Sequence, residues 1–218
     1  MTEPDVTLTD YTLAIECLVF SALVHRRPAP AVGLKGWFTL FFASVCAASL
    51  FGGTVHGFFL DADSTGHAIL WPASLVAIGL TTWAAWAIGA GLLFSDRISR
   101  LCAAAAGIEF LVYSLLVIFI TSNFKIAVIN YSPAALFLLI AFLTAYRREK
   151  HGAYLFGVSG MVLTFAAALC QQLGLGLHPI YFNHNAVYHV IQAVALFLIF
   201  LAARRLATTQ SVTGEDQC

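Results

Sequence analysis

Seven apolar stretches, each long enough or nearly long enough to cross a membrane as a helix, dominate this chain. They cover residues 10–25, 36–59, 67–94, 98–121, 128–146, 152–174 and 184–205. A helix needs about 20 apolar residues to span the hydrocarbon layer. Charged residues make up 10% of the chain, against about 25% in soluble domains. The sequence therefore predicts an all-α membrane protein, with a seven-helix domain over 10–205, a polar segment over 1–9 and a polar tail over 206–218.

The basic residues predict how this bundle is oriented. Ten of the eleven lie in the first, third and fifth connections or at the C-terminal end: Arg26, Arg27, Lys35, Arg97, Arg100, Arg147, Arg148, Lys150, Arg204 and Arg205. Lysine and arginine are enriched in cytoplasmic loops, so the N-terminus is expected outside and the C-terminus inside. The short loops favour a multi-pass protein of a bacterial inner membrane.

Histidines gather on the predicted outer side. His56 lies about one turn before the outer end of the second helix, and His67 starts the third. His189 lies roughly 8 Å below the start of the seventh helix, and Glu16 is similarly deep in the first. Ionisable groups inside a membrane are costly, and they usually face the bundle interior. These residues therefore predict a polar chamber in the outer layer.

The start of the seventh helix carries a polar stripe. Asn185, His189 and Gln192 are spaced four and three residues apart, so they share one helix face. His184 points about 140° away from His189 on a regular helix, so it either precedes the helix or lies at the rim. Three imidazoles plus water form a common catalytic zinc site. The predicted metal ligands are His56, His189 and either His67 or His184.

Three segments resemble the CREST superfamily of membrane proteins, which includes the alkaline ceramidases and the progestin and adiponectin receptors. They are "LTDYTLAIE", "GGTVHGF" and "HNAVYHVIQAVAL". The resemblance implies a seven-helix fold and a zinc site, with His56 and His189 as ligands. The chain has Asn185, Gly52 and His67 where that family has a histidine, a serine and an aspartate. Two explanations stay open: His67 has become a ligand, or the metal has been lost.

Two functions follow as hypotheses. The first is a zinc-dependent hydrolase that cleaves an amide or ester of a lipid, in which Glu16, Asp61 or Asn185 orients a ligand or the attacking water. The second is a receptor or sensor without enzymatic activity, which binds a lipid, another apolar small molecule or protons in the same chamber. No basic face or motif indicates a nucleic-acid partner. A retinal-binding rhodopsin is excluded, because its Schiff base needs a lysine inside the membrane. Here Lys35, Lys125 and Lys150 all lie in or beside loops.

Overall fold

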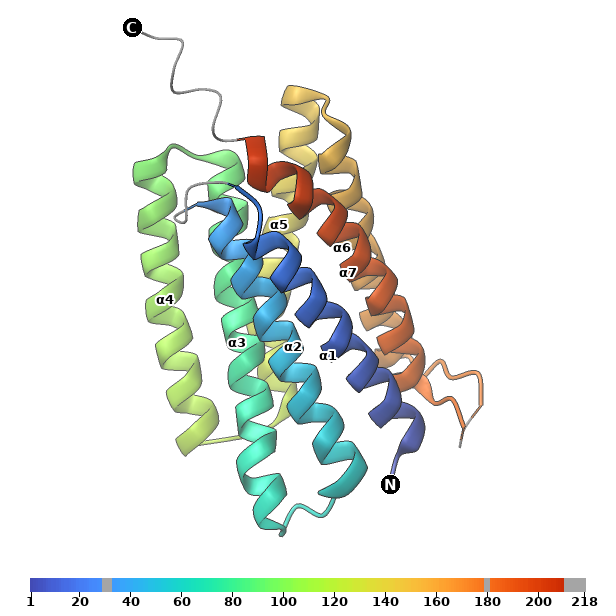
Figure 1. Ribbon diagram of the computed structural model, residues 1–218. Helices are drawn as coiled ribbons and strands as arrows, with labels where there is room; N and C mark the ends of the chain where they lie inside the picture. The colour runs from blue at the N-terminus through green and yellow to red at the C-terminus, as the bar shows by residue number, and fades with distance from the viewer. Residues whose placement is uncertain (29–32, 179–180, 210–218) are drawn as a thin grey trace, which may run out of the picture.

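The computed structural model describes residues 1–28, 33–178 and 181–209, and these form seven α-helices (Figure 1). The helices are α1 Pro4–His25, α2 Leu34–Phe58, α3 Thr65–Leu93, α4 Asp96–Phe119, α5 Phe124–Glu149, α6 Gly152–Gln172 and α7 His184–Thr209. All seven are long and apolar enough to cross a membrane. The all-α, seven-helix prediction is confirmed.

Two helices differ in their limits from the prediction. α1 begins at Pro4 rather than at residue 10, so most of the segment predicted as a polar extension is the first turn and a half of a helix. Proline suits this position, because the first residues of a helix have no intrahelical partner for their N–H groups. α7 continues to Thr209, beyond the predicted end at residue 205.

α7 is a regular helix from His184 onward. The side-chain oxygen Oδ1 of Asn183 accepts hydrogen bonds from the backbone N–H groups of Asn185 (2.9 Å) and Ala186 (3.1 Å). An asparagine in this position caps the free N–H groups of the first helical turn. The cap fixes where α7 begins, and on a regular helix the spacing of the polar side chains that follow then sets their directions relative to one another.

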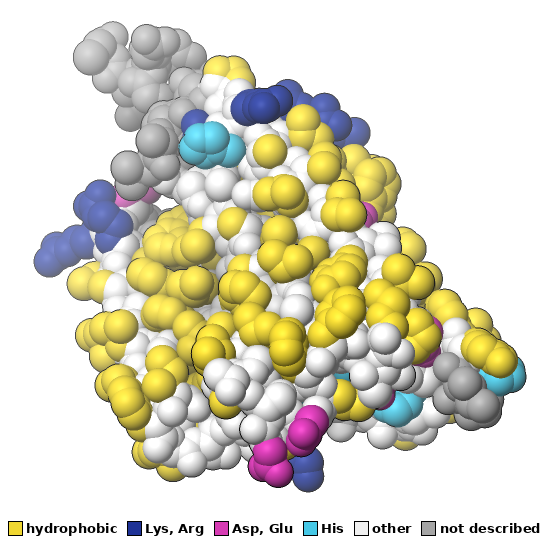
Figure 2. Space-filling view, turned by 60° about the horizontal axis from the view of Figure 1, so that its bottom comes forward, with side chains coloured by type: hydrophobic (Ala, Val, Ile, Leu, Met, Phe, Trp, Pro, Cys, Tyr) yellow, Lys and Arg dark blue, Asp and Glu magenta, His cyan; other side chains and the backbone are white. Residues whose placement is uncertain are grey.

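The helices form a ring in the order α1, α2, α3, α5, α6 and α7, and α7 closes it against α1. α4 packs against the outside of α3, and α7 also contacts α2 across the ring. The N-terminus and the end of α7 lie at opposite ends of the bundle (Figure 1). The face in Figure 2 is mostly apolar, with most of its lysine and arginine side chains away from the lower end, where acidic side chains lie beside a basic one.

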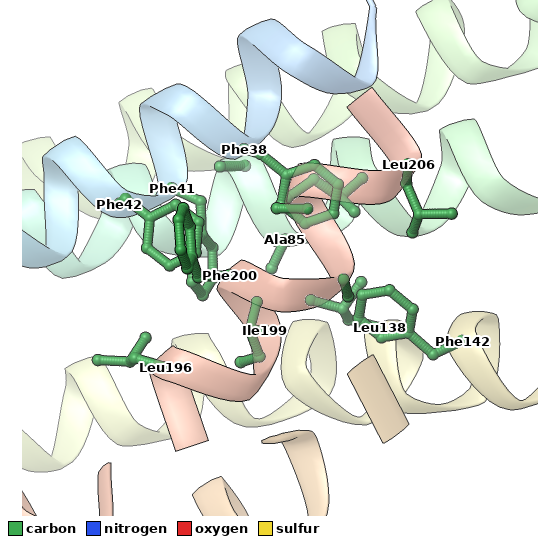
Figure 3. Packing of buried hydrophobic residues seen from close by; sticks show 14 of the residues in the cluster. Phe38, Phe41, Phe42, Ala85, Leu138, Phe142, Leu196, Ile199, Phe200 and Leu206 are labelled. Carbon is green, nitrogen blue, oxygen red and sulfur yellow. The ribbon is translucent and has the colours of Figure 1, made fainter. Parts of the chain in front are cut away.

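The larger apolar cluster lies mainly in the half of the bundle away from the N-terminus, and a smaller one lies between α3, α4 and α5. Phe20 of α1 stacks on Phe200 of α7 with ring centroids 4.2 Å apart, and Phe42 of α2 meets Phe20 edge-on at 5.6 Å. Figure 3 shows Phe200 beside the α2 rings, while Leu138 of α5 lies near the other side of α7. Polar side chains of α1 and α7 are therefore left to the opposite half, which holds the N-terminus.

Close packing of α1 on α2 depends on Gly53. A Cβ atom on this residue would lie 2.7 Å from the Cβ of Asp10 and 3.2 Å from the ring of Tyr11. No side chain fits at that distance, so glycine lets the two helices approach closely. The contact carries Asp10 into the interior of the bundle, where only 5% of its surface is exposed.

Candidate functional site

His189 lies at the centre of a buried polar cluster between α7 and α1. Its Nδ1 atom is 2.9 Å from Oγ1 of Thr9, and its Nε2 atom is 3.3 Å from Oδ1 of Asp10. Only 9% of the histidine surface is exposed. Both ring nitrogens therefore face polar atoms of α1, and the imidazole joins the two helices.

The hydroxyl of Thr9 indicates where the protons lie. Its Oγ1 donates to the backbone carbonyl oxygens of Asp5 (2.9 Å) and Val6 (3.0 Å) in the preceding turn. A threonine hydroxyl has one proton, so Oγ1 is left to accept from Nδ1–H of His189. The second nitrogen, Nε2, then faces a carboxylate oxygen of Asp10, and two acceptors need a proton between them. The arrangement favours a neutral pair that holds one shared proton.

A second imidazole–carboxylate pair lies nearer the end of the bundle. Nδ1 of His56 on α2 is 2.6 Å from Oε2 of Glu3, which directly precedes α1. Both side chains are partly exposed, so water weakens this ion pair relative to a buried one. The backbone of α1 is held at the same place, because the N–H of Glu3 donates to the carbonyl oxygen of His56.

His67 and Asp61 take part in local structure around the α2–α3 connection. Nδ1 of His67 lies 3.1 Å from the carbonyl oxygen of Phe59, and its ring stacks on Trp71 at 5.9 Å. Trp71 also meets the ring of His56, edge-on at 6.2 Å. Asp61 is exposed, and its Oδ1 accepts from the backbone N–H of Asp63. Its described contacts are therefore those of a turn residue.

The polar stripe of α7 faces two different helices. Asn185 accepts a hydrogen bond from Gln171 of α6 (3.0 Å), and Gln192 donates one to Thr164 of α6 (3.3 Å). His189, between them, faces α1. The three residues do share an inward face, but Asn185 pairs with α6 rather than with the histidine cluster.

His184 and Glu16 lie apart from the pair of His189 and Asp10. His184 is the first residue of α7 and lines an open hollow of about 380 Å³ with Gly174, Gly176 and Asn183. Glu16 is half-buried on α1, and its Oε2 has no hydrogen-bond partner in the part of the chain that the structure describes. It lies roughly 9 Å along α1 from Asp10 and about 240° around the helix.

The described side chains do not form the predicted zinc ligand set. Within residues 1–28, 33–178 and 181–209, no three histidine, cysteine, aspartate or glutamate side chains are grouped so that they could hold a metal ion. His56 contacts Glu3, His67 contacts a carbonyl oxygen and His189 contacts Thr9 and Asp10. Zinc binding stays a prediction.

Sequence reasoning missed three residues of the two imidazole pairs: Glu3, Thr9 and Asp10. Glu3 precedes a proline at a helix start, and this signal could have moved the predicted start of α1 toward the N-terminus. Asp10 follows Val6 by four residues and precedes Leu13 by three, so it shares their buried face. That spacing marks Asp10, rather than Glu16, as the inward carboxylate.

Comparison with known proteins identifies one family. A protein-family model matches residues 6–208, nearly the whole chain, and it is described as a family of unknown function, DUF6962. A search of curated proteins and a search of solved structures each found no match. The resemblance to CREST proteins therefore stays a prediction. Because the match covers far more than half of its length, the chain belongs to the DUF6962 family.

Proposed function

We propose that this chain is a proton-responsive seven-helix receptor or sensor of the membrane. The observation that carries the proposal is the pair of His189 and Asp10, buried between α1 and α7 and linked on its other side to Thr9. Imidazoles change charge between about pH 5 and 8, which is the range in which a sensor of external acidity has to respond.

The physical response follows from the shared proton. With the proton bound, the buried pair is neutral and joins α1 to α7. As the pH rises and the proton leaves, a negative charge remains in an environment where burying a charge is costly. The contact is therefore strongest at low pH and weakens as the pH rises. Two other titratable groups, His56 on α2 and Asp5 on α1, also act electrostatically on His189.

The first prediction concerns how stability depends on pH. In a sodium-free choline buffer, the melting temperature of the protein in lipid nanodiscs should fall between about pH 5 and 8. The loss of one proton is worth at most roughly 3–5 °C per pH unit in a chain of this size. Asp10→Asn should remove this fall, because no carboxylate is left to become charged, whereas His25→Gln, a change of an exposed histidine at the other end, should preserve it. Equal pH profiles for the wild type and Asp10→Asn would rule out the sensor.

We also propose the orientation that places this pair on the outer side. Ten of eleven basic residues support an external N-terminus and a cytoplasmic C-terminus, in a bacterial inner membrane. Reporter domains fused after Arg97 and Arg148 should give a cytoplasmic signal, and a fusion at Asp63 should not. A cytoplasmic signal at Asp63 would place the histidines on the inner side and contradict sensing of the exterior.

The second candidate is a zinc-dependent hydrolase acting on a lipid amide or ester. An unpartnered oxygen of Asp10 beside His189 favours it, because carboxylate and imidazole both bind zinc. Elemental analysis of protein purified without chelator separates the two candidates. Stoichiometric zinc with turnover of a lipid amide or ester supports the hydrolase, and metal-free protein with the expected pH response supports the sensor. A lipid or another apolar molecule is the predicted partner in the hydrolase and in a ligand-binding receptor.

A further inference from the structure

The carboxylate of Asp10 has a second oxygen that the pair with His189 does not use. Oδ2 is buried and has no hydrogen-bond partner among the described residues. It faces Gly52 of α2, where a Cβ atom would lie 3.8 Å from Oδ2 and 3.5 Å from Oγ of Ser74 on α3. Oδ2 of Asp10 and Oγ of Ser74 thus lie within 4 Å of one point. The missing side chain of Gly52 leaves room at this point for one small species.

The polar atoms around this point offer lone pairs rather than protons. The hydroxyl of Ser74 donates its proton to the carbonyl oxygen of Ala48 (3.1 Å), so its Oγ can only accept from another group. A buried group of acceptors is satisfied by a cation or by a hydrogen-bond donor.

We propose that a sodium ion binds between Oδ2 of Asp10 and Oγ of Ser74, in the space above Gly52. Hard cations take oxygen ligands such as carboxylates, hydroxyls and water. The carboxylate supplies the negative charge that offsets the dehydration of the ion, and water completes its coordination. Sodium is smaller than potassium, so it fits more readily into the space left by one missing side chain. A sodium ion or a proton can each compensate the charge of Asp10, but the sodium site is a separate proposal from proton sensing.

The test compares melting temperatures in sodium, potassium and choline chloride at about pH 8, where the shared proton has left the pair. Equal concentrations of about 0.15 M keep charge screening constant. Sodium should raise the melting temperature of the wild type by about 3–6 °C relative to choline when the site is nearly saturated, and potassium by less. Equal melting temperatures in all three salts would overturn the proposal. That result is expected if a water molecule, rather than an ion, fills the space.

Variants of the site locate the effect. The methyl group of Gly52→Ala makes ordinary contacts with Asp10 and Ser74, so the fold is kept while the space for the ion is filled. Its sodium shift should vanish, and Ser74→Ala should reduce the shift. Ser44→Ala removes a different buried hydroxyl, which lies on α2 and is bonded to Thr81 of α3, and this variant should keep the full shift. A full sodium shift in Gly52→Ala would contradict the assignment.

The same variants separate this site from the proton sensor. Gly52→Ala leaves Oδ1 of Asp10 and the ring of His189 in place, so its pH profile in choline should match that of the wild type. A sodium effect without a pH response refutes the sensor alone, and the reverse result refutes the sodium site alone.

Discussion

Asp10→Ala should lower the free energy of unfolding by about 1–3 kcal/mol, because it leaves a buried nitrogen of His189 without a partner. The carboxylate is 5% exposed and His189 is 9% exposed, so water cannot replace the lost contact. Equilibrium unfolding in mixed micelles at low pH would measure the change. Asp61→Ala removes an exposed carboxylate at the same end and should change stability by at most about 0.5 kcal/mol.

The interaction itself can be isolated by combining Asp10→Ala with His189→Ala. Residues in contact usually show coupling energies of about 0.5–3 kcal/mol in such a cycle. The double variant should therefore be more stable than the sum of the single losses predicts. Strictly additive losses would mean that the two side chains do not interact in the folded protein.

A methyl group on Gly160 should force α6 away from α7. A Cβ atom there would lie 2.7 Å from the backbone carbonyl oxygen of Ala195 and 3.1 Å from the backbone nitrogen of Ile199. Backbone atoms cannot rotate aside as a side chain does, and overpacking costs typically about 1–3 kcal/mol. Gly160→Ala should therefore lower the free energy of unfolding in the same assay. The higher helix propensity of alanine offsets at most about 1 kcal/mol of the overpacking cost.

Gly152→Ala provides the matched control on the same helix. A Cβ atom on Gly152 has no described neighbour within 4 Å, so this variant should be as stable as the wild type or slightly more stable. If the two glycine variants unfold alike, the close contact between α6 and α7 is wrong.

The helices could be predicted because membrane spans are a local property of sequence. A run of about 20 apolar residues is enough to indicate one, and all seven runs correspond to helices. The direction of His184 also follows from local geometry. On a regular helix it points away from His189, and in the structure it lines the hollow beside the end of α6. The start of α1 was missed, because a hydropathy pattern ignores the proline that begins it.

The partners of the histidines could not be read in the same way, because they depend on how neighbouring helices are rotated and how closely they pack. The sequence places Asn185 and His189 on one face of α7 but does not say that α6 takes the first and α1 the second. Likewise, Gly53 sets how deeply Asp10 enters the bundle, and this depth is a property of two helices together.

Nitrogen NMR of the histidine rings tests the pair of His189 and Asp10 most directly. Protein labelled with ¹⁵N at histidine would be recorded in lipid nanodiscs from about pH 5 to 8, and His189→Gln would assign the signals of His189 by their loss. These signals should shift with pH, and Asp10→Asn should change or abolish the shift, while the signals of His25 should not respond to Asp10→Asn. Signals of His189 that stay constant with pH, or that are the same in Asp10→Asn, would contradict a proton shared between α1 and α7.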